Sequence, residues 1–239
     1  MARSAVHAPI TNKILDRLPA KDRKRVLAAC DEVDLAFEQV IDEPGGTIRH
    51  AYFPTSGFIS LLASMGGKST LEVALSGNEG MYGVPLAFGV AVSPVQALVQ
   101  GGGRAMRIDA AAFRRELDEV PALRSGVDRY IYVVMSQLIQ TAGCTRFHVV
   151  EQRLARWLLM TSDRAHVSPF RITHEFLAYM LGVRRVGITE AATALQKREL
   201  IGYTRGVVTI RDRKGLERAA CGCYRSDLAT YQRAFGESL

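Results

Sequence analysis

Two arginines, Arg184 and Arg185, stand side by side within the segment Ile172–Leu200. A guanidinium group can donate two parallel hydrogen bonds to the O6 and N7 atoms of guanine in the major groove of DNA. Of the side chains that follow, Val186 could contact a thymine methyl group, and Glu190 could accept from cytosine or pair with a nearby arginine. These residue types predict a group of base-reading side chains.

The flanking residues must hold these side chains at the exposed start of a helix. Apolar residues recur at helical spacing in two short stripes, Phe176, Leu177, Met180 and Leu181, and then Ile188, Ala191, Ala192 and Leu195. Thr173 is placed to cap the first helix, and Gly182 lies where the chain must reverse with positive φ. The pattern predicts a helix-turn-helix whose second helix enters the major groove. The alternative is an ordinary helix pair with a solvated arginine pair.

A strand–turn–strand pattern follows the second helix. Leu200–Ile210 reads as a strand, a glycine turn at Arg205-Gly206 and a second strand, which predicts a β-hairpin, or wing, beside the helix. Arg205 at its tip is predicted to contact phosphate.

The distribution of charge supports this prediction. The chain has 239 residues and a net charge of +7. Residues 1–150 carry 16 Lys and Arg against 15 Asp and Glu, whereas residues 151–239 carry 15 against 9, so the excess lies with the predicted helix-turn-helix. No apolar run approaches the ~18 residues of a membrane span, and the N-terminus lacks the pattern of a secretory signal. With four irregularly spaced cysteines, these features predict a cytoplasmic protein without a membrane partner.

The first half of the chain has a different sequence pattern, with mainly short strand-like runs in place of helical spacing. Residues 12–30 predict one or two short helices around Pro19, and residues 33–107 predict short strands separated by glycine and proline turns. The predicted strand runs are 37–41, 47–53, 57–64 and 70–75, with turns at 42–46 and 65–68. This spacing is typical of an antiparallel sandwich or barrel. The glycine-rich stretch 77–100 is either an anion-binding loop or a sharp corner.

Helical patterns dominate the next part. Residues 110–117 predict a short helix, and Pro121 begins a helix of roughly two dozen residues with a heptad-like apolar seam. This seam is the predicted homodimer interface, comprising Val127, Ile131, Val134, Leu138, Thr141 and Thr145. Residues 151–161 predict a further amphipathic helix with Leu154, Trp157 and Leu158 inward, and the tail from Leu216 predicts a polar helix near the wing.

In order and length, these parts resemble the Crp–Fnr family of bacterial transcription regulators. The resemblance rests on residues 51–61 (AYFPTSGFISL), 152–159 (QRLARWLL) and 172–200. It implies an α+β fold with an N-terminal antiparallel β-roll, or jelly roll, a long central dimerisation helix and a C-terminal winged helix-turn-helix. The implied domains are a cyclic-nucleotide-binding-like sensor over 12–118, the dimerisation helix over 119–147 and the DNA-binding domain over 148–239.

The resemblance also implies DNA-binding positions and partners. Arg185 aligns with the guanine-reading arginine of the family, whereas Val186 replaces a glutamate and His174 replaces a basic residue, so a different half-site sequence is expected. The partners implied are double-stranded DNA, a second copy of the chain and RNA polymerase. The predicted DNA-contacting residues are Thr173, His174, Arg184, Arg185, Val186, Thr189, Glu190 and Arg205.

The predicted effector pocket departs from the family. Cyclic-AMP-binding members have a Gly-Glu-Leu and an Arg-Ser pair where this chain has Gly83, Val84 and Pro85 and, further on, Ser93. A buried phosphate would lack its arginine, so no cyclic-AMP binding is expected and the effector is unassigned. Residues 1–29 lack the cysteines of the iron–sulfur members, and Cys221 and Cys223 form an incomplete zinc site. No cofactor and no metal are therefore predicted.

The sequence thus predicts a dimeric, sequence-specific DNA-binding transcription regulator. An enzyme is disfavoured because the chain has no Ser-His-Asp, HExxH, P-loop or paired-carboxylate signature. A cyclic-nucleotide-binding module that controls a protein partner is the alternative, and the basic C-terminal part argues against it.

Overall fold

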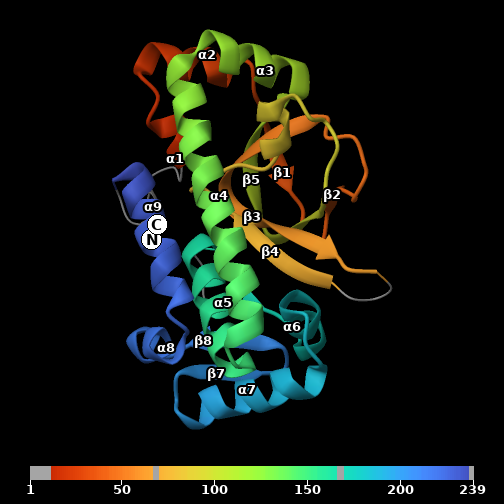
Figure 1. Cartoon of the computed structure of the whole chain (residues 1–239), viewed down its shortest axis with the longest axis vertical. Coiled ribbons are helices and arrows are strands. Elements are labelled where there is room, and N and C mark those ends of the chain that lie inside the picture. The colour runs from red at the N-terminus through yellow and green to blue at the C-terminus, as the bar shows by residue number, and fades with distance from the viewer. Residues whose placement is uncertain (1–11, 67–69, 166–169, 237–239) are drawn as a thin grey trace, which may run out of the picture.

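The computed structural model describes residues 12–66, 70–165 and 170–236. Figure 1 shows a β-roll with its short helices at one end of the molecule and a mainly helical C-terminal part at the other, and the long helix α4 (Pro121–Phe147) runs beside the β-roll toward the C-terminal part. The short helices α1 (Lys13–Asp16) and α2 (Ala20–Ala28) flank Pro19, and α3 (Ala110–Glu119) precedes α4, as predicted. In the described ranges, no helix is both long and apolar enough to cross a membrane.

The β-roll is an antiparallel sheet of five strands: β1 (Asp31–Leu35), β2 (Val40–Asp42), β3 (His50–Ser64), β4 (Thr70–Ser76) and β5 (Gln96–Asp109). Its order is β1-β5-β3-β4, and β2 pairs with β5 beside β1. The predicted strand runs 47–53 and 57–64 are wrong as separate strands, because most of both lies in β3. Gly57, with φ of +71°, lets β3 bend against Gly101 of β5 without ending.

Two further strand predictions need correction. The segment Asp31–Leu35, for which no separate strand run was predicted, forms β1 at the edge of the sheet on β5, and its two apolar residues, Val33 and Leu35, alternate with acidic residues. The predicted run 37–41 contributes only its last two residues to β2. The predicted turn at residues 65–68 lies partly outside the described residues.

The inner face of α4 closes the β-roll. Pro121 occupies the first helical turn, where its missing N–H breaks no bond. The residues of α4 that are buried against the rest of the chain are Leu123, Val127, Tyr130, Val133, Gln137 and Cys144. Gly80 lies against the Tyr130 ring so closely that an added Cβ would stand 2.1 Å from it. The close approach explains why this corner of the glycine-rich stretch requires glycine.

The outer face of α4 corrects the predicted seam. Val127 is fully buried in the core of its own chain, so it is unable to contact a second copy. Val134 packs against the same core. Leu138 of the predicted seam is exposed, and the other exposed apolar positions, Tyr132, Met135 and Ile139, each lie one residue beyond a predicted seam position. Periodicity alone did not identify which of two apolar faces the β-roll covers.

The C-terminal part begins with α5 (Val150–Ala165), on which Leu154, Trp157 and Leu158 are buried as predicted. There follow β6 (Phe170–Arg171), α6 (His174–Leu181), α7 (Arg185–Lys197), β7 (Ile201–Thr204), β8 (Val207–Ile210), α8 (Arg213–Ala219) and α9 (Cys223–Phe235). The three strands form an antiparallel sheet in the order β6-β8-β7.

The prediction that the polar C-terminal tail lies near the wing is wrong for α9, which extends away from the wing. It runs back along α4 toward the β-roll (Figure 1). Tyr231 and Phe235 at its far end enter the core of the β-roll, where Phe235 also lies under the guanidinium of Arg17. The C-terminal helix therefore ties the two ends of the molecule together.

Two buried ion pairs hold α5, one to the β-roll and one to α9. Arg164 of α5 donates from Nε to Glu79 of the β-roll at 2.7 Å, and both side chains are at most 1% exposed. Arg156 of α5 pairs with Asp227 of α9, also at 2.7 Å. Both pairs orient α5, because leaving either buried charge without its partner costs about 3–5 kcal/mol.

A buried carboxyl group lies at the same junction. Glu72 of β4 accepts from Trp157 Nε1 of α5 at 2.8 Å and from Gln100 Nε2 of β5 at 3.2 Å. Burial raises the pKa of Glu72 from its ordinary value of 4.5 to about 7, against the smaller opposing effects of its hydrogen bonds and of nearby arginines. The folded chain therefore holds a proton on Glu72 more tightly than the unfolded chain does.

This raised pKa predicts a pH dependence of stability. The free energy of unfolding should fall as pH rises from about 4.5 to about 7, because Glu72 must lose its proton while buried. A pKa change of this size corresponds to about 3 kcal/mol. The variant Glu72→Gln should remove this decline and be more stable than the parent at neutral pH, as measured by denaturant unfolding between about pH 5 and pH 8.

The exposed Glu175→Gln variant is the matched control and should keep the decline of the parent. Parallel pH profiles for the parent and Glu72→Gln would contradict the assignment to Glu72.

Candidate nucleic-acid interface

Helices α6 and α7 are joined by the tight turn that their sequence predicted. The Thr173 hydroxyl accepts from the N–H of Phe176 at 3.1 Å and caps α6. Gly182 ends α6 with φ of +61°, in the left-handed region that favours glycine. Arg184 is the N-cap residue of α7 and Arg185 its first helical residue. The predicted helix-turn-helix is confirmed at each of these positions.

Helix α7 presents one apolar face and one polar face. Ile188, Ala191, Ala192 and Leu195 are buried against the rest of the C-terminal part. The opposite face and its N-terminal end are open to solvent, and they carry Arg184, Arg185, Val186, Thr189 and Glu190. Val186 is 61% exposed, although a valine at the start of a helix could equally have faced the core. The predicted base-reading side chains therefore share one accessible surface.

The arginines of this surface are available to an anion. Within the described ranges, Arg184, Arg185 and Arg205 form no salt bridge with a carboxylate. By contrast, Arg198 at the far end of α7 pairs with Glu151 of α5 at 2.7 Å. The uncompensated positive charge lies at the N-terminal end of α7, where the helix dipole also favours a phosphate.

His174 differs from the other predicted contacts because it already has partners within the chain. Its Nδ1 lies 3.0 Å from the Thr189 hydroxyl, and its ring stacks on Tyr203 with centroids 4.4 Å apart. Burial, and secondarily the positive charge of Arg185, lowers the pKa of His174 below its ordinary value. A neutral imidazole that links α6, α7 and the wing is therefore the state at neutral pH.

The wing is a two-residue hairpin between β7 and β8. Arg205 and Gly206 form its tip with φ of +50° and +76°, as a type I′ turn requires. The Arg205 side chain is exposed. The sequence did not reveal the third strand, β6, which pairs with β8 through only two residues and is too short to show a period.

The predicted effector pocket is a packed corner. Gly83 has φ of +99° and precedes a 3₁₀ helix, η1 (Val84–Phe88), that contains Val84 and Pro85. Ser93 is buried, and its hydroxyl donates to the carbonyl oxygen of Val95 at 2.7 Å. The neighbouring Tyr82 hydroxyl donates to Asp42 at 2.8 Å and lies 3.3 Å from the Ser93 hydroxyl. The polar groups of this corner are thus used within the chain.

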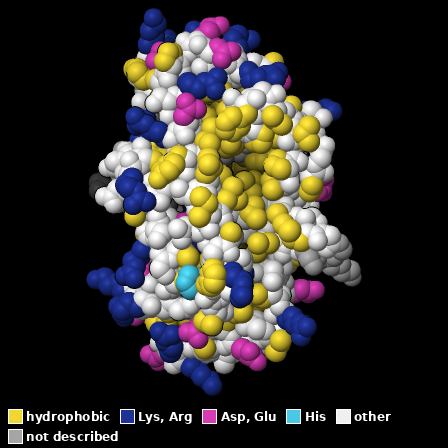
Figure 2. All heavy atoms as spheres, in the orientation of Figure 1, with side chains coloured by type: hydrophobic (Ala, Val, Ile, Leu, Met, Phe, Trp, Pro, Cys, Tyr) yellow, Lys and Arg dark blue, Asp and Glu magenta, His cyan; other side chains and the backbone are white. Residues whose placement is uncertain are grey.

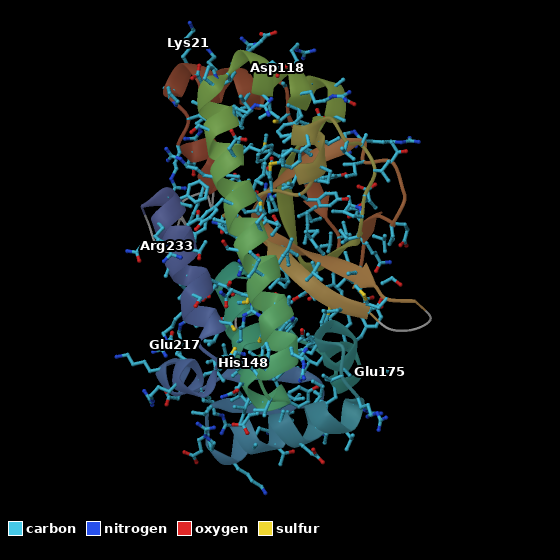
Figure 3. All side chains as sticks on the ribbon, in the orientation of Figure 1. Lys21, Asp118, His148, Glu175, Glu217 and Arg233 are labelled. Carbon is cyan, nitrogen blue, oxygen red and sulfur yellow. The ribbon has the colours of Figure 1, made fainter. Side chains whose placement is uncertain are left out.

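The structure corrects the description of Cys221 and Cys223 as an incomplete zinc site. Both lie beside Cys144 and His148, which come from the C-terminal end of α4 (Figure 3 labels His148). The sequence signal was a Cys-x-x-x-His pattern over 144–148, one helical turn, in addition to Cys-x-Cys over 221–223. It was missed because Cys144 and Cys221 are 77 residues apart in the sequence, and spacing alone did not indicate that they are neighbours in the fold.

Comparison with known proteins agrees with this architecture. Residues 152–219 match the family described as Crp-like helix-turn-helix domain. No curated protein matches the sequence.

Solved structures of similar fold cover most of the chain. The c-di-GMP-responsive global regulator CLP of Xanthomonas campestris is 17% identical, with a TM-score of 0.67, over 80% of this chain and 99% of that one. FixK2 of Bradyrhizobium japonicum is 11% identical, also with a TM-score of 0.67, over 80% and 98%. A putative Crp/Fnr-family regulator of Eubacterium rectale is 18% identical, with a TM-score of 0.66, over 87% and 97%.

At these identities the solved structures establish the fold, and the matched domain lies where the helix-turn-helix was found. The chain therefore has the architecture of the Crp–Fnr regulators and carries their Crp-like helix-turn-helix domain at residues 152–219.

Proposed function

We propose that this chain is a sequence-specific DNA-binding transcription regulator that acts as a homodimer. The observation that carries the proposal is the group of solvent-exposed side chains at the N-terminal end of α7, with two arginines that form no salt bridge in the described part of the chain. In helix-turn-helix proteins, this end of the second helix contacts base edges.

The proposed contacts divide into two kinds. Arg185 and Val186 point from the first turn of α7 and read base edges, with Glu190 one turn further along. Arg184, Arg205 and Thr173, which surround this turn, contact the phosphate backbone and set the position of the helix. His174 and Thr189 support this surface through their mutual contact and through Tyr203, in addition to any contact of their own.

Dimerisation is proposed through the outer face of α4. Tyr132, Met135, Leu138 and Ile139 are each at least 41% exposed, and the residues 132, 135 and 139 follow heptad spacing. Figure 2 shows hydrophobic side chains gathered over α4 and the adjoining β-roll on this face of the molecule. A two-fold copy packed along this stripe would bury it and place two recognition helices ~34 Å apart on a symmetric site.

Substitution of Arg185 and of Arg205, one at a time, distinguishes base reading from phosphate contact. Arg185→Ala should flatten the preference at one base pair of each half-site, because a bidentate arginine–guanine contact is worth about 1–3 kcal/mol of discrimination. Arg205→Ala should lower the affinity for all DNA sequences by the same factor. It should also reduce the slope of log affinity against log salt concentration by about one. Binding-site selection and salt-dependent mobility shifts measure these effects.

Arg114→Ala, an exposed arginine of α3 in the β-roll, is the control and should behave as the parent. Unchanged base preference in Arg185→Ala would show that another residue reads the site.

A charge in the outer stripe of α4 should disrupt the dimer. In Met135→Glu, two carboxylates would lie near the two-fold axis of a dry interface, so the chain should sediment as a monomer and bind a half-site at most weakly. Met65→Glu is the matched control, since Met65 is also an exposed methionine but lies directly after β3, away from α4. If Met135→Glu sediments as the parent does and the parent is a dimer, the interface lies elsewhere.

We further propose that the β-roll does not take cyclic AMP as an effector. Ser93 and Pro94 stand where the family has its phosphate-binding Arg-Ser pair, and the hydroxyl groups of this corner are bonded within the chain. Calorimetric titration with cyclic AMP should therefore give no saturable heat. Saturable micromolar binding that also raises operator affinity would overturn this proposal.

A further inference from the structure

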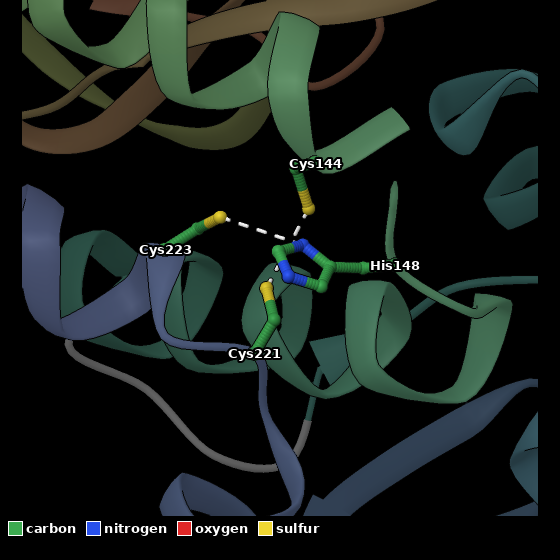
Figure 4. A group of neighbouring side chains, drawn as sticks. All are labelled: Cys144, His148, Cys221 and Cys223. Atoms are coloured by element: carbon green, nitrogen blue, oxygen red, sulfur yellow. Dashed lines mark hydrogen bonds between the residues drawn. The ribbon is translucent and has the colours of Figure 1, made fainter. Parts of the chain in front are cut away.

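Four metal-ligating side chains meet where the end of α4 approaches the segment between α8 and α9. They are Cys144 and His148 from the first, and Cys221 and Cys223 from the second, and Figure 4 shows them pointing toward one another. One ligand atom from each residue lies within 4.8 Å of the other three. The Sγ atoms of Cys144 and Cys221 are 3.5 Å apart, and Cys223 Sγ is 3.6 Å from His148 Nδ1.

These distances suit a tetrahedral metal ion. Zinc binds thiolate sulfur at ~2.3 Å and imidazole nitrogen at ~2.0–2.1 Å, so neighbouring ligands of a tetrahedral site lie roughly 3.5–3.8 Å apart. Three cysteines and one histidine are a full donor set of the kind that structural zinc sites use, with no position left for a substrate. Soft sulfur ligands exclude magnesium and calcium, which prefer oxygen.

The local structure holds these ligands in place without the metal. Cys144 and His148 are four residues apart, so both face the same side at the end of α4, where His148 is the C-cap residue. Cys223 is the first residue of α9. The three thiols are free and at most 6% exposed, and they form a small cluster apart from both apolar cores.

The charge of a loaded site would be balanced nearby. Three thiolates and one zinc(II) ion carry a net charge of −1, which requires a counter-charge when buried. The guanidinium groups of Arg153 and Arg156 interact electrostatically with Cys144 and Cys221. Arg156 is already neutralised by Asp227, whereas Arg153 donates to the carbonyl oxygen of Leu181, so its charge is left to balance the site.

We propose that Cys144, His148, Cys221 and Cys223 form a structural zinc(II) site. Binding replaces three S–H protons by the metal, so three protons are released for each ion bound to a fully protonated site and no oxidant is needed. The ion would crosslink the end of α4 to the start of α9, whose other end lies in the core of the β-roll. It would thus fix the helix-turn-helix relative to the dimer helix, a consequence that rests on the proposed function.

The site itself is tested on the full chain, purified with reduced thiols and stripped of metal by a chelator. Titration with cobalt(II) should saturate at one ion per chain and give the thiolate-to-metal charge-transfer and intense d–d absorption of a tetrahedral site, and zinc(II) should displace the cobalt. Cys221→Ser and His148→Ala should weaken binding by more than the ~10–100-fold that loss of an outer-shell partner causes.

Cys30→Ser is the matched control, because Cys30 lies between α2 and β1 and its thiol donates to the carbonyl oxygen of Val26. It should still bind one ion. Absence of stoichiometric cobalt binding by the reduced parent would overturn the site, as would a Cys144–Cys221 disulfide in the protein as isolated. The parent spectrum decides this even if a variant fails to fold.

The coupling to DNA is measured separately, as operator affinity of the metal-free and zinc-loaded parent. Loading should raise this affinity and raise Tm. If the chain binds zinc but no DNA sequence, the proposed function is contradicted and the zinc site is still supported. If operator affinity is equal with and without zinc, only the proposed coupling between zinc and DNA binding is overturned.

Discussion

The buried ion pair between Arg164 and Glu79 is the constraint on which the arrangement of the molecule depends. It joins α5, the first helix of the C-terminal part, to the glycine-rich corner of the β-roll, and water reaches neither side chain. Helix α9 also contacts the backbone of Glu79, since the Tyr231 hydroxyl donates to the Glu79 carbonyl oxygen at 3.5 Å. Burial makes this pair demanding, because each charge is tolerated only while the other is in place.

Other interactions of the junction reinforce the same placement of α5. The indole of Trp157 donates to Glu72, and Arg156 pairs with Asp227, so α5 is held by β4, by the corner after it and by α9. Helix α5 also packs on α7, so packed helices connect α7 to the β-roll.

The proposed zinc site lies at the junction between α4 and α5. The chain leaves α4 at His148 and enters α5 two residues later, and the segment before α9 passes the same point. Ion pairs hold α5 to the β-roll and to α9, and the four ligands would join the end of α4, just before α5, to the start of α9.

The amino-acid sequence determined those features whose physics is local: the Thr173 cap, the positive φ of Gly182, the hairpin at Arg205-Gly206 and the exposed arginines of α7. Features that depend on distant partners were decided only by tertiary structure. Helix α4 has two apolar faces, and packing against the β-roll determined that Val127 is buried and Met135 exposed. In the same way, Cys144 and Cys221 became neighbours only because α9 turns back along α4, since sequence spacing carries no information about contacts made by a returning chain.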